Sequence, residues 1–493
     1  MTAAGLRQWH EDPQLIAAAA TPLGRVAICV AAAVLLGWLG AFRVPSARTL
    51  LGLIALVIPA VTLWPGRRRE LLSVASAVAV FDYFRRRNLP ALDLLTPESW
   101  AVPAEPGLRF FLLAAGLLVG LSVFVNIAGR LYAWPAILRR YPVAWLHITA
   151  WLVLLAIPAV PLLGVAAEIL PLVLWRLSYS LRYFARPGNG HARLADHLFY
   201  LWPVAGIGRF APVGKGLDYL ARHEAGNAAD LARSQLAGLK LLGLAVAWTV
   251  AVWLIDAFLY GDAKSPAYAW FGGASLGLSK LTALLGGQDV PIGERVAGLF
   301  LNLIRDTTQA AAIGHLFVGC FRLFGFRIFR DVYRPLVAQS IVDFWNRRTW
   351  YFKELMTDLF FYPTFLSASF TGPRLRLLLA VMAAAGFGNF YFHLLYFGDI
   401  EKGGYAGILD ARMASHAVYC LLLATGIWLS MLRQQASRGD RPRGGSRGRR
   451  GWRRLRAIAG VWIFYAFVHL WSGTVSDLGP LARLRWLLAG TAG

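Results

Sequence analysis

The chain has 493 residues, of which 57% are hydrophobic and 15% are charged. Soluble domains carry about 25% charged residues. The apolar residues here gather in runs of roughly 18 to 25, each long enough to cross a hydrocarbon core of about 30 Å. This excludes a soluble globular enzyme, a disordered chain, a disulfide-stapled secreted domain and an outer-membrane barrel, whose strands alternate apolar and polar residues. The sequence predicts an all-α, polytopic integral membrane protein.

The net charge of +24 arises from 50 Lys and Arg residues against 26 Asp and Glu residues. The basic residues lie mainly in short loops between apolar runs, as in 65–70, 85–87 and 433–456. This distribution is the positive-inside pattern of membrane proteins, so no nucleic-acid partner is expected. Basic loops also attract anionic lipid or an acidic carrier.

Ten apolar runs are predicted to span the membrane. They are 25–43, 48–64, 108–130, 143–160, 162–178, 238–260, 296–320, 374–398, 413–432 and 457–472. Pro158 and Pro161 divide the long run 143–178, because proline removes a helix hydrogen bond.

Three further segments are shorter or amphipathic and are expected to be interfacial or re-entrant: 71–84, 267–285 and 480–491. We therefore expect about nine to twelve membrane helices. They form a single polytopic domain, 25–493, after a cytoplasmic or interfacial N-terminus, 1–24.

The orientation follows from the most basic stretch. Residues 433–456 hold ten arginines together with glycine, serine and one proline. Such a composition cannot bury a core of its own, and the positive-inside rule places it in the cytoplasm. We expect a disordered cytoplasmic loop, 433–456, in a protein of the bacterial inner membrane. The connection 398–412 is glycine-rich and mildly acidic, which fits the opposite side.

Polar residues inside apolar runs are candidates for function, because a charge at mid-bilayer costs roughly 2.5 to 3.5 kcal/mol. They are Asn126, Glu168, Asp256, Arg305, Asp306, His315, His393, His416 and His469. Most have a structural explanation, since Asp256 and Glu168 can each pair with a nearby arginine. No CxxC, HExxH or other metal-ligand spacing occurs, so no metal site is expected.

His393 stands apart because aromatic residues surround it and Gly386 and Gly388 precede it. Glycines let another helix or an acyl chain approach the backbone closely. A buried neutral imidazole can accept a proton from a hydroxyl, and a general base contributes about 10²- to 10⁴-fold in rate. The alternative is a structural hydrogen bond between helices, with Asn389 as a local partner.

The stretch 333–365 is aromatic but heavily charged. Read as a helix, it pairs Asp343 with Arg347 at i,i+4 and presents a broad apolar face, and Pro363 is expected to end it. A helix with this charge does not cross lipid easily. It is expected at an interface or along a polar cavity, and the alternative is an interfacial helix with snorkelling arginines.

Within this stretch, SIVDFWNRRTWYFKEL (340–355) is followed about 40 to 50 residues later by His393 in an apolar helix. The pair resembles the membrane-bound O-acyltransferase family, whose members carry an aromatic, arginine-rich motif ending in Asn, Asp or His. The segment 199–220 is similar, more weakly, to the family's re-entrant proline- and glycine-rich stretch. The likeness covers about 195–472.

The family's polar motif residue falls on Thr349 and its second tryptophan on Arg348; a one-place shift would bring Trp350 and Tyr351 to these positions. Neither alignment reproduces the pattern. The resemblance therefore implies His393 as the base, with Asn346 or Thr349 as its catalytic partner, or with that second group missing.

The resemblance implies transfer of an acyl group from a thioester donor, acyl-CoA or acyl carrier protein, to a hydroxyl acceptor, with no tightly bound cofactor. Such transfer needs donors for the developing oxyanion and exclusion of water. Cationic side chains near the cytoplasmic face are candidates for holding donor phosphates, or alternatively for anchoring the protein in the membrane. The predicted substrate-binding residues are Asp343, Trp345, Arg347, Arg348, Lys353 and Asn389.

Two other functions remain open on the sequence. One is a membrane transporter, although the chain shows no matching pair of broken helices in two halves. The other is a catalytically silent relative that acts as a scaffold or lipid-binding module. The expected partners are membrane lipid, the acyl donor, a hydroxyl-bearing acceptor (polysaccharide, lipid, peptide or small metabolite) and an accessory protein.

Overall fold

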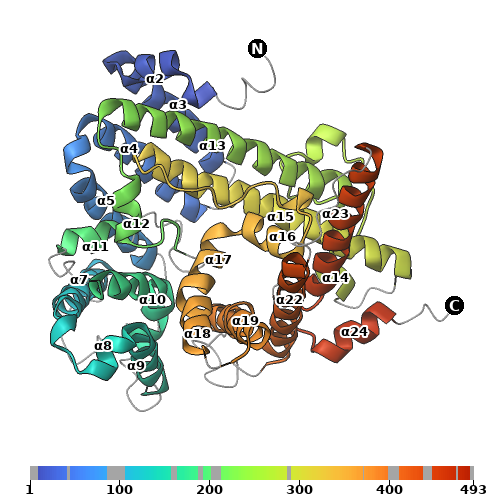
Figure 1. The fold of residues 1–493 in the computed structure, drawn as a ribbon. Helices are drawn as coiled ribbons and strands as arrows, with labels where there is room; N and C mark the ends of the chain where they lie inside the picture. Colours follow the sequence, from blue (N-terminus) through green and yellow to red (C-terminus); the bar gives the residue numbers. More distant parts are fainter. Residues whose placement is uncertain are drawn as a thin grey trace. The chain divides into compact units, whose positions relative to one another are not determined.

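The structure, a computed structural model, describes most of the chain. The described residues are 9–41, 45–85, 106–156, 164–186, 193–200, 212–285, 290–369, 371–397, 410–436, 447–473 and 476–488. Within these ranges the chain forms helices and no β-strand, apart from one isolated bridge between Glu224 and Phe326. The predicted all-α class is confirmed for this part of the chain (Figure 1).

Four described helices are long and apolar enough to cross a membrane. They are Pro22–Ala41, Ala228–Leu259, Pro373–Leu395 and Ala411–Ala436. Each coincides with one of the apolar runs predicted from the sequence. A backbone in lipid must satisfy its hydrogen bonds within its own segment, and a continuous helix does so.

The helices belong to two compact units. Unit 1 comprises residues 1–243 and 316–329, and unit 2 comprises residues 244–315 and 330–493. Two long helices contribute residues to both units: α13 (Ala228–Leu254) and α15 (Ile292–Leu323).

Unit 1 contains the N-terminal helices. They are η1 (Trp9–Glu11), α2 (Pro13–Ala20), α3 (Pro22–Ala41), α4 (Pro45–Leu63), η2 (Pro65–Arg67), α5 (Arg68–Arg85), α7 (Pro106–Gly129), η3 (Leu131–Ala133), α8 (Ala136–Arg140), α9 (Pro142–Ala156), α10 (Gly164–Phe184), α11 (Leu194–Tyr200) and α12 (Leu217–His223). Helix α3 packs on α4, and at Gly40 a Cβ would lie in ordinary contact, 3.7 Å from the Leu51 side chain.

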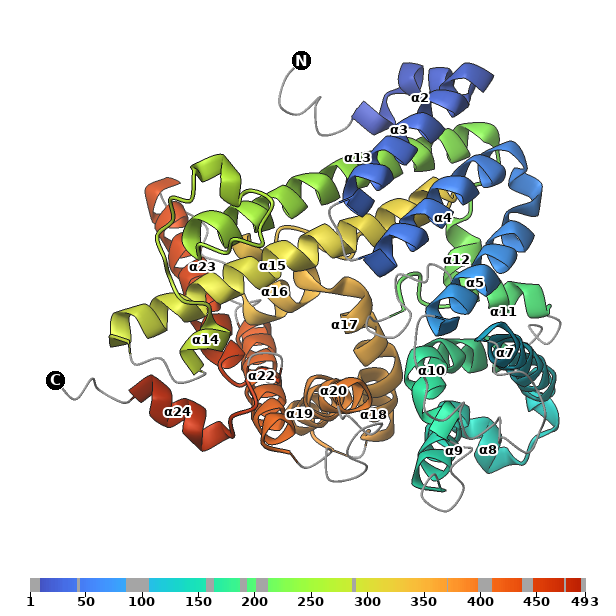
Figure 2. The ribbon, with the colours of Figure 1, turned by 180° about the vertical axis from the view of Figure 1, so that it is seen from behind.

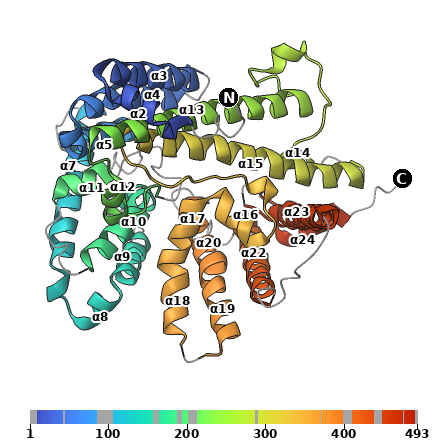
Figure 3. The ribbon, with the colours of Figure 1, turned by 45° about the horizontal axis from the view of Figure 1, so that its top comes forward.

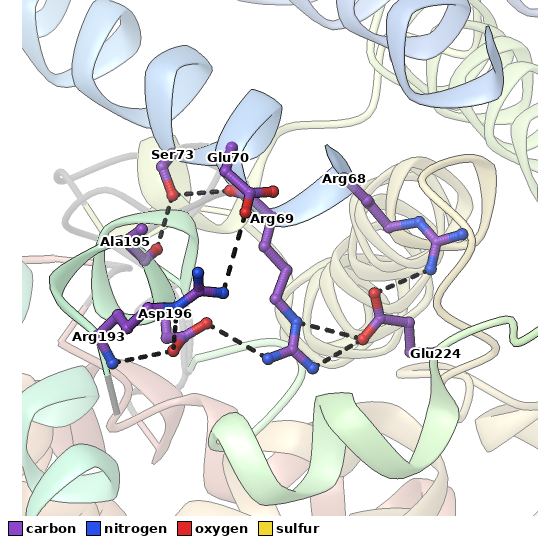
Figure 4. Close-up of polar contacts among 8 residues, drawn as sticks. All are labelled: Arg68, Arg69, Glu70, Ser73, Arg193, Ala195, Asp196 and Glu224. Carbon is purple, nitrogen blue, oxygen red and sulfur yellow. Dashed lines mark hydrogen bonds and ion pairs between the residues drawn. The ribbon is translucent and has the colours of Figure 1, made fainter. Parts of the chain in front are cut away.

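An ion-pair network joins the start of α5 to α11 and to Glu224 at the end of α12 (Figure 4). Arg68, only 2% exposed, donates through Nη1 to Glu224 Oε1 at 3.0 Å. Arg69 donates through Nη2 to Glu224 Oε2 at 2.8 Å and through Nη1 to Asp196 at 3.3 Å. Part of the basic stretch 65–70 is therefore paired with carboxylates of unit 1.

We expect the substitution Glu224→Gln to lower the free energy of unfolding by about 1.5 to 3 kcal/mol. It removes the charge that both arginines share, and hydrogen bonds to charged groups are worth that much. The midpoint of thermal unfolding in detergent measures the effect. Glu70→Gln is the matched control, because Glu70 is half exposed and reaches Arg193 only at 3.9 Å; equal losses in the two variants would contradict the account.

Unit 2 contains the remaining elements. They are η6 (Ile255–Leu259), η7 (Tyr268–Phe271), α14 (Leu281–Leu285), η8 (Pro335–Val337), α16 (Ile341–Arg348), α17 (Trp350–Met356), η9 (Thr357–Phe361), α18 (Tyr362–Ser367), α19 (Pro373–Val381), η10 (Met382–Gly388), α20 (Asn389–Phe397), α22 (Ala411–Ala436), α23 (Arg447–His469) and α24 (Pro480–Leu488). The stretch from α17 to α18 runs antiparallel to that from α19 to α20 (Figure 3). On its other side, the second stretch packs against α22 (Figure 2).

Turns of π-helix interrupt two of these antiparallel elements, at η9 and η10. The two turns meet where Gly388 of η10 lies against Phe360 of η9, and a Cβ on Gly388 would come within 2.8 Å of that ring. The expectation that the glycines before His393 admit a close neighbour is confirmed at this point. π-Turns inside α-helices are frequent at functional sites.

The prediction that Pro363 ends a helix is wrong. The backbone continues as helix from α17 through η9 into α18, which runs to Ser367. In the π-turn, the N–H of Tyr362 donates to the carbonyl of Thr357, five residues back. Pro363 then lies in the first turn of α18, where the missing N–H of proline is tolerated.

The predicted basic loop 433–456 is helical at both ends. Residues 433–436 belong to α22, and residues 447–456 belong to α23; 437–446 lie outside the described residues. Arginine is a good helix former, so arginines next to an apolar run extend its helix instead of ending it. Half of the weaker family likeness at 199–220, residues 201–211, also lies outside the described part.

Candidate functional site

The arginine-rich motif forms α16, which begins at a side-chain cap. Ser340 Oγ accepts a hydrogen bond from the N–H of Asp343 at 3.1 Å, which satisfies a donor of the first turn. One turn later, Asp343 Oδ1 accepts from Arg347 Nε at 2.6 Å, as predicted. The Tyr465 hydroxyl of α23 donates to the Ile341 carbonyl at 2.9 Å. The motif is therefore a short, capped helix fixed to α23.

Asp331 holds the junction between α16 and α17. Its Oδ1 accepts the N–H of Tyr351, and its backbone carbonyl accepts the N–H of Trp350, both at 2.9 Å. The Arg347 carbonyl accepts the N–H of Tyr333 at 2.8 Å. Burial raises the pKa of the Asp331 carboxyl to about 6, although the N–H groups of Tyr351 and Trp350 lower it in part.

This raised pKa predicts a pH dependence of stability. Between about pH 4 and pH 6, folded Asp331 holds a proton that the unfolded chain releases, so its contribution to stability falls as the pH rises through this window. Asp331→Asn keeps an acceptor for Tyr351 but does not titrate. As the pH rises, we therefore expect the unsubstituted protein to lose stability relative to this variant. Thermal unfolding in detergent at several pH values measures the difference. If the unsubstituted protein instead gained stability relative to the variant, the pKa of folded Asp331 would have to be lowered.

Aromatic rings connect the motif to His393. The Trp345 ring of α16 lies 5.6 Å from the Phe352 ring, centroid to centroid. The Phe352 ring lies 6.2 Å from that of His393 and 4.9 Å from that of Phe392. Phe392 is buried, whereas His393 keeps part of its accessible surface. Two residues predicted for one site, Trp345 and His393, thus belong to one group of contacting rings.

His393 is also part of a group of polar side chains that we call the histidine cluster: His393, His416, Tyr419, His469 and Asp306. The rings of His393 and His416 meet edge to face at 4.3 Å, and His416 stacks on Tyr419 at 5.1 Å. Tyr419 lies 6.1 Å from the His469 ring, and His469 Nδ1 lies 3.7 Å from Asp306 Oδ2. Four helices supply this cluster, all through residues of unit 2: α15, α20, α22 and α23.

Arg348 of α16 directs its charge toward the histidine cluster. The guanidinium acts electrostatically on Asp306, Tyr419 and His469, and its Nε atom is buried. Arg348 and Arg305 therefore both place positive charge near the Asp306 carboxyl group.

The other two predicted phosphate-binding cations have acidic neighbours as well. Arg347 pairs with Asp343 at 2.6 Å. Lys353 forms an ion pair with Glu354, and its Nζ lies 5.4 Å from the Trp350 ring. A donor phosphate would have to compete with these carboxylates.

The predicted catalytic partners of His393 lie in different surroundings. Asn346 is exposed on α16, and Thr349 is partly buried between α16 and α17, where its side chain caps neither helix. Asn389 is 1% exposed, and its side-chain nitrogen and oxygen have no hydrogen-bond partner among the described residues. The alternative of a local bond from Asn389 to His393 is therefore not formed, and Asn389 places an uncompensated amide one turn before His393.

Other polar residues of the apolar runs have structural roles. Asp256 accepts two hydrogen bonds from Arg305, at 2.6 and 2.9 Å, which confirms the predicted pairing with an arginine. His315 and Asn126 each bond to a carbonyl of their own helix. The side chain of Glu168 lies outside the described residues.

The sequence singled out His393 but gave His416, His469 and Asp306 no role in the same site. The only signal was that each is a polar residue in an apolar run. Their mutual proximity depends on the register of four separate helices, and no local spacing encodes it.

The chain matches no protein-family model, and it matches no curated protein sequence. The fold thus defines a helical protein whose described residues include four helices suited to crossing a membrane.

Proposed function

We propose that this protein is an integral-membrane O-acyltransferase that moves an acyl group from a thioester donor to a hydroxyl acceptor, with His393 as the general base. The observation that carries the proposal is the position of His393. The residue keeps part of its accessible surface although its Nδ1 atom is buried, and its ring lies 4.3 Å from the buried His416 ring and 6.2 Å from the ring of Phe352 in the arginine-rich motif.

The substrates and His393 account for every bond and proton in the proposed transfer. The acceptor oxygen attacks the thioester carbonyl while His393 takes the hydroxyl proton. The carbon–sulfur bond then breaks, and the thiolate leaves with that proton. A base within hydrogen-bond reach of the hydroxyl contributes about 10²- to 10⁴-fold, and the surrounding aromatic rings exclude water that would hydrolyse the donor. No bound cofactor or metal enters these steps.

The membrane arrangement is part of the same proposal. We infer about nine to twelve membrane helices in the bacterial inner membrane, with the basic segment 433–456 on the cytoplasmic side. The donor is acyl-CoA or acyl carrier protein, and the proposed partners are membrane lipid, the hydroxyl acceptor and an accessory protein. Nucleic acid has no place in this account.

A catalytically silent relative is the second candidate function, and one observation favours it. Asn346, a predicted partner of His393, is exposed, which leaves Thr349 as the remaining candidate for the family's second polar group. Such a protein would bind lipid or acyl donor without cleaving the thioester.

The experiment that separates these functions measures thiol release. Purified protein in liposomes is given a series of acyl-CoA donors with candidate hydroxyl acceptors. We expect one thiol released for each ester formed, with both products dependent on the acceptor. Donor binding without thiol release supports the silent relative, and solute flux without thiol release supports a transporter.

A further inference from the structure

His416 has one tautomer in this structure. The residue is 2% exposed on α22, and its Nδ1 accepts a hydrogen bond from the N–H of Gly473 at 3.1 Å. A nitrogen that accepts must carry a lone pair, so in the neutral ring the proton resides on Nε2. Nε2 is therefore a hydrogen-bond donor.

The contact with Gly473 depends on a close backbone approach. A Cβ at this position would lie 3.3 Å from His416 Cβ and 3.4 Å from Nδ1, closer than side chains ordinarily pack. The neighbouring backbone is held by Arg483, which is fully buried and donates to the carbonyls of Leu470 and Ser472, both at 2.8 Å. Gly473 and Arg483 are positioning residues for the His416 ring.

The donor at Nε2 lacks an acceptor. This atom is buried and has no hydrogen-bond partner among the described residues, while the ring is held between Tyr419 and His393. A buried donor left unpaired costs about 1 to 3 kcal/mol. A site that fixes the tautomer and leaves its donor unpaired is suited to a ligand that brings the acceptor.

We propose that His416 is a second functional histidine, which donates its Nε2–H to the carbonyl oxygen of an acyl group bound beside His393. The inference rests on the proposed function for the identity of that oxygen. During transfer, the thioester carbonyl oxygen gains negative charge as the acceptor oxygen attacks, and the His416 hydrogen bond stabilises it without proton transfer. Removing one such donor costs about 10²- to 10³-fold in kcat.

The first test is independent of activity. The full-length protein is labelled with ¹⁵N-histidine, and His416→Gln identifies the His416 signals by their loss. We expect the free protein to show an unprotonated Nδ1 and a protonated Nε2. A protonated Nδ1 would overturn the proposal.

The second test adds a probe that carries the carbonyl but cannot react: ketone analogues of acetyl-CoA and palmitoyl-CoA, in which CH₂ replaces the thioester sulfur. We expect the His416 Nε2 signal to move on binding. If an analogue binds and this signal stays unchanged, the proposal fails while the proposed function stands. If neither analogue binds, the proposed donor and this inference fail together.

The third test measures steady-state kinetics with an acyl-CoA thioester that supports transfer. His416→Ala is expected to lower kcat by about 10²- to 10³-fold with little change in KM, and His416→Gln, which retains an N–H donor, to recover part of the loss. Gly473→Ala, which presses on the ring, is expected to lower kcat in the same direction. An unchanged kcat in His416→Ala would assign the residue to structure alone.

Discussion

His393→Ala is expected to reduce acyl transfer by about 10²- to 10⁴-fold, the range that a general base contributes. The imidazole takes the proton of the acceptor hydroxyl, and alanine has no group that can do so. Thiol release from acyl-CoA measures the loss, and thermal unfolding in detergent checks that the fold survives. Survival is expected because the residue keeps part of its accessible surface and its contacts include the rings of Phe352, Phe392 and His416, which remain in place without it.

The matched control is His223→Ala in unit 1, where the side chain bonds to the carbonyl of Tyr219 in its own helix at 2.8 Å and packs against the Tyr219 ring at 4.1 Å. This variant should transfer acyl groups at the unsubstituted rate. Full activity in His393→Ala, with the fold intact, would remove the base assignment.

Arg483→Ala is expected to lower the free energy of unfolding by about 4 kcal/mol or more, a loss that few single substitutions cause. The guanidinium is fully buried and donates to four backbone carbonyls, those of Leu470, Ser472, Ser476 and Leu478. Alanine leaves these acceptors without a donor, at about 1 to 3 kcal/mol each, in addition to a cavity. Thermal and denaturant unfolding in detergent measure the loss.

Arg485→Ala serves as the control, because Arg485 lies two residues further on the same helix, α24, and is exposed. Its effect should stay within about 0.5 kcal/mol, as for most surface substitutions. Similar stability of the two variants would contradict the structural role of Arg483.

Features set by local sequence were predictable. The apolar runs 374–398 and 413–432 became helices because a segment of this length and composition has one satisfactory conformation in lipid. The pair of Asp343 and Arg347 formed as predicted, since residues four apart on a helix are neighbours whatever surrounds them. These predictions required no knowledge of which helices pack together.

Features set by packing were not predictable. Pro363 continues a helix because a π-turn precedes it, and that turn packs Phe360 against Gly388. The hydrophobic periodicity of a single helix contains no record of such a contact. The basic segment near Arg447 is a different case: it was expected as a loop although it begins α23, because its charge was weighed and the helix propensity of arginine next to an apolar run was not.

Of the two histidines in the candidate site, only His393 could be predicted from the sequence, because contacts between helices are not encoded locally. His393 drew attention through its own surroundings in sequence. Its neighbour His416 is supplied by another helix, and the hydrogen bond that orients His416 comes from Gly473, beyond the end of α23. A constellation assembled from three segments becomes visible only when the helices are placed.

The most direct test of the central claim is a structure of the protein with a bound ketone analogue of acyl-CoA. The account predicts density for the acyl carbonyl within hydrogen-bond distance of His416 Nε2 and beside the His393 ring. Density for the analogue at a site remote from both histidines, with the His393 ring facing lipid, would contradict it.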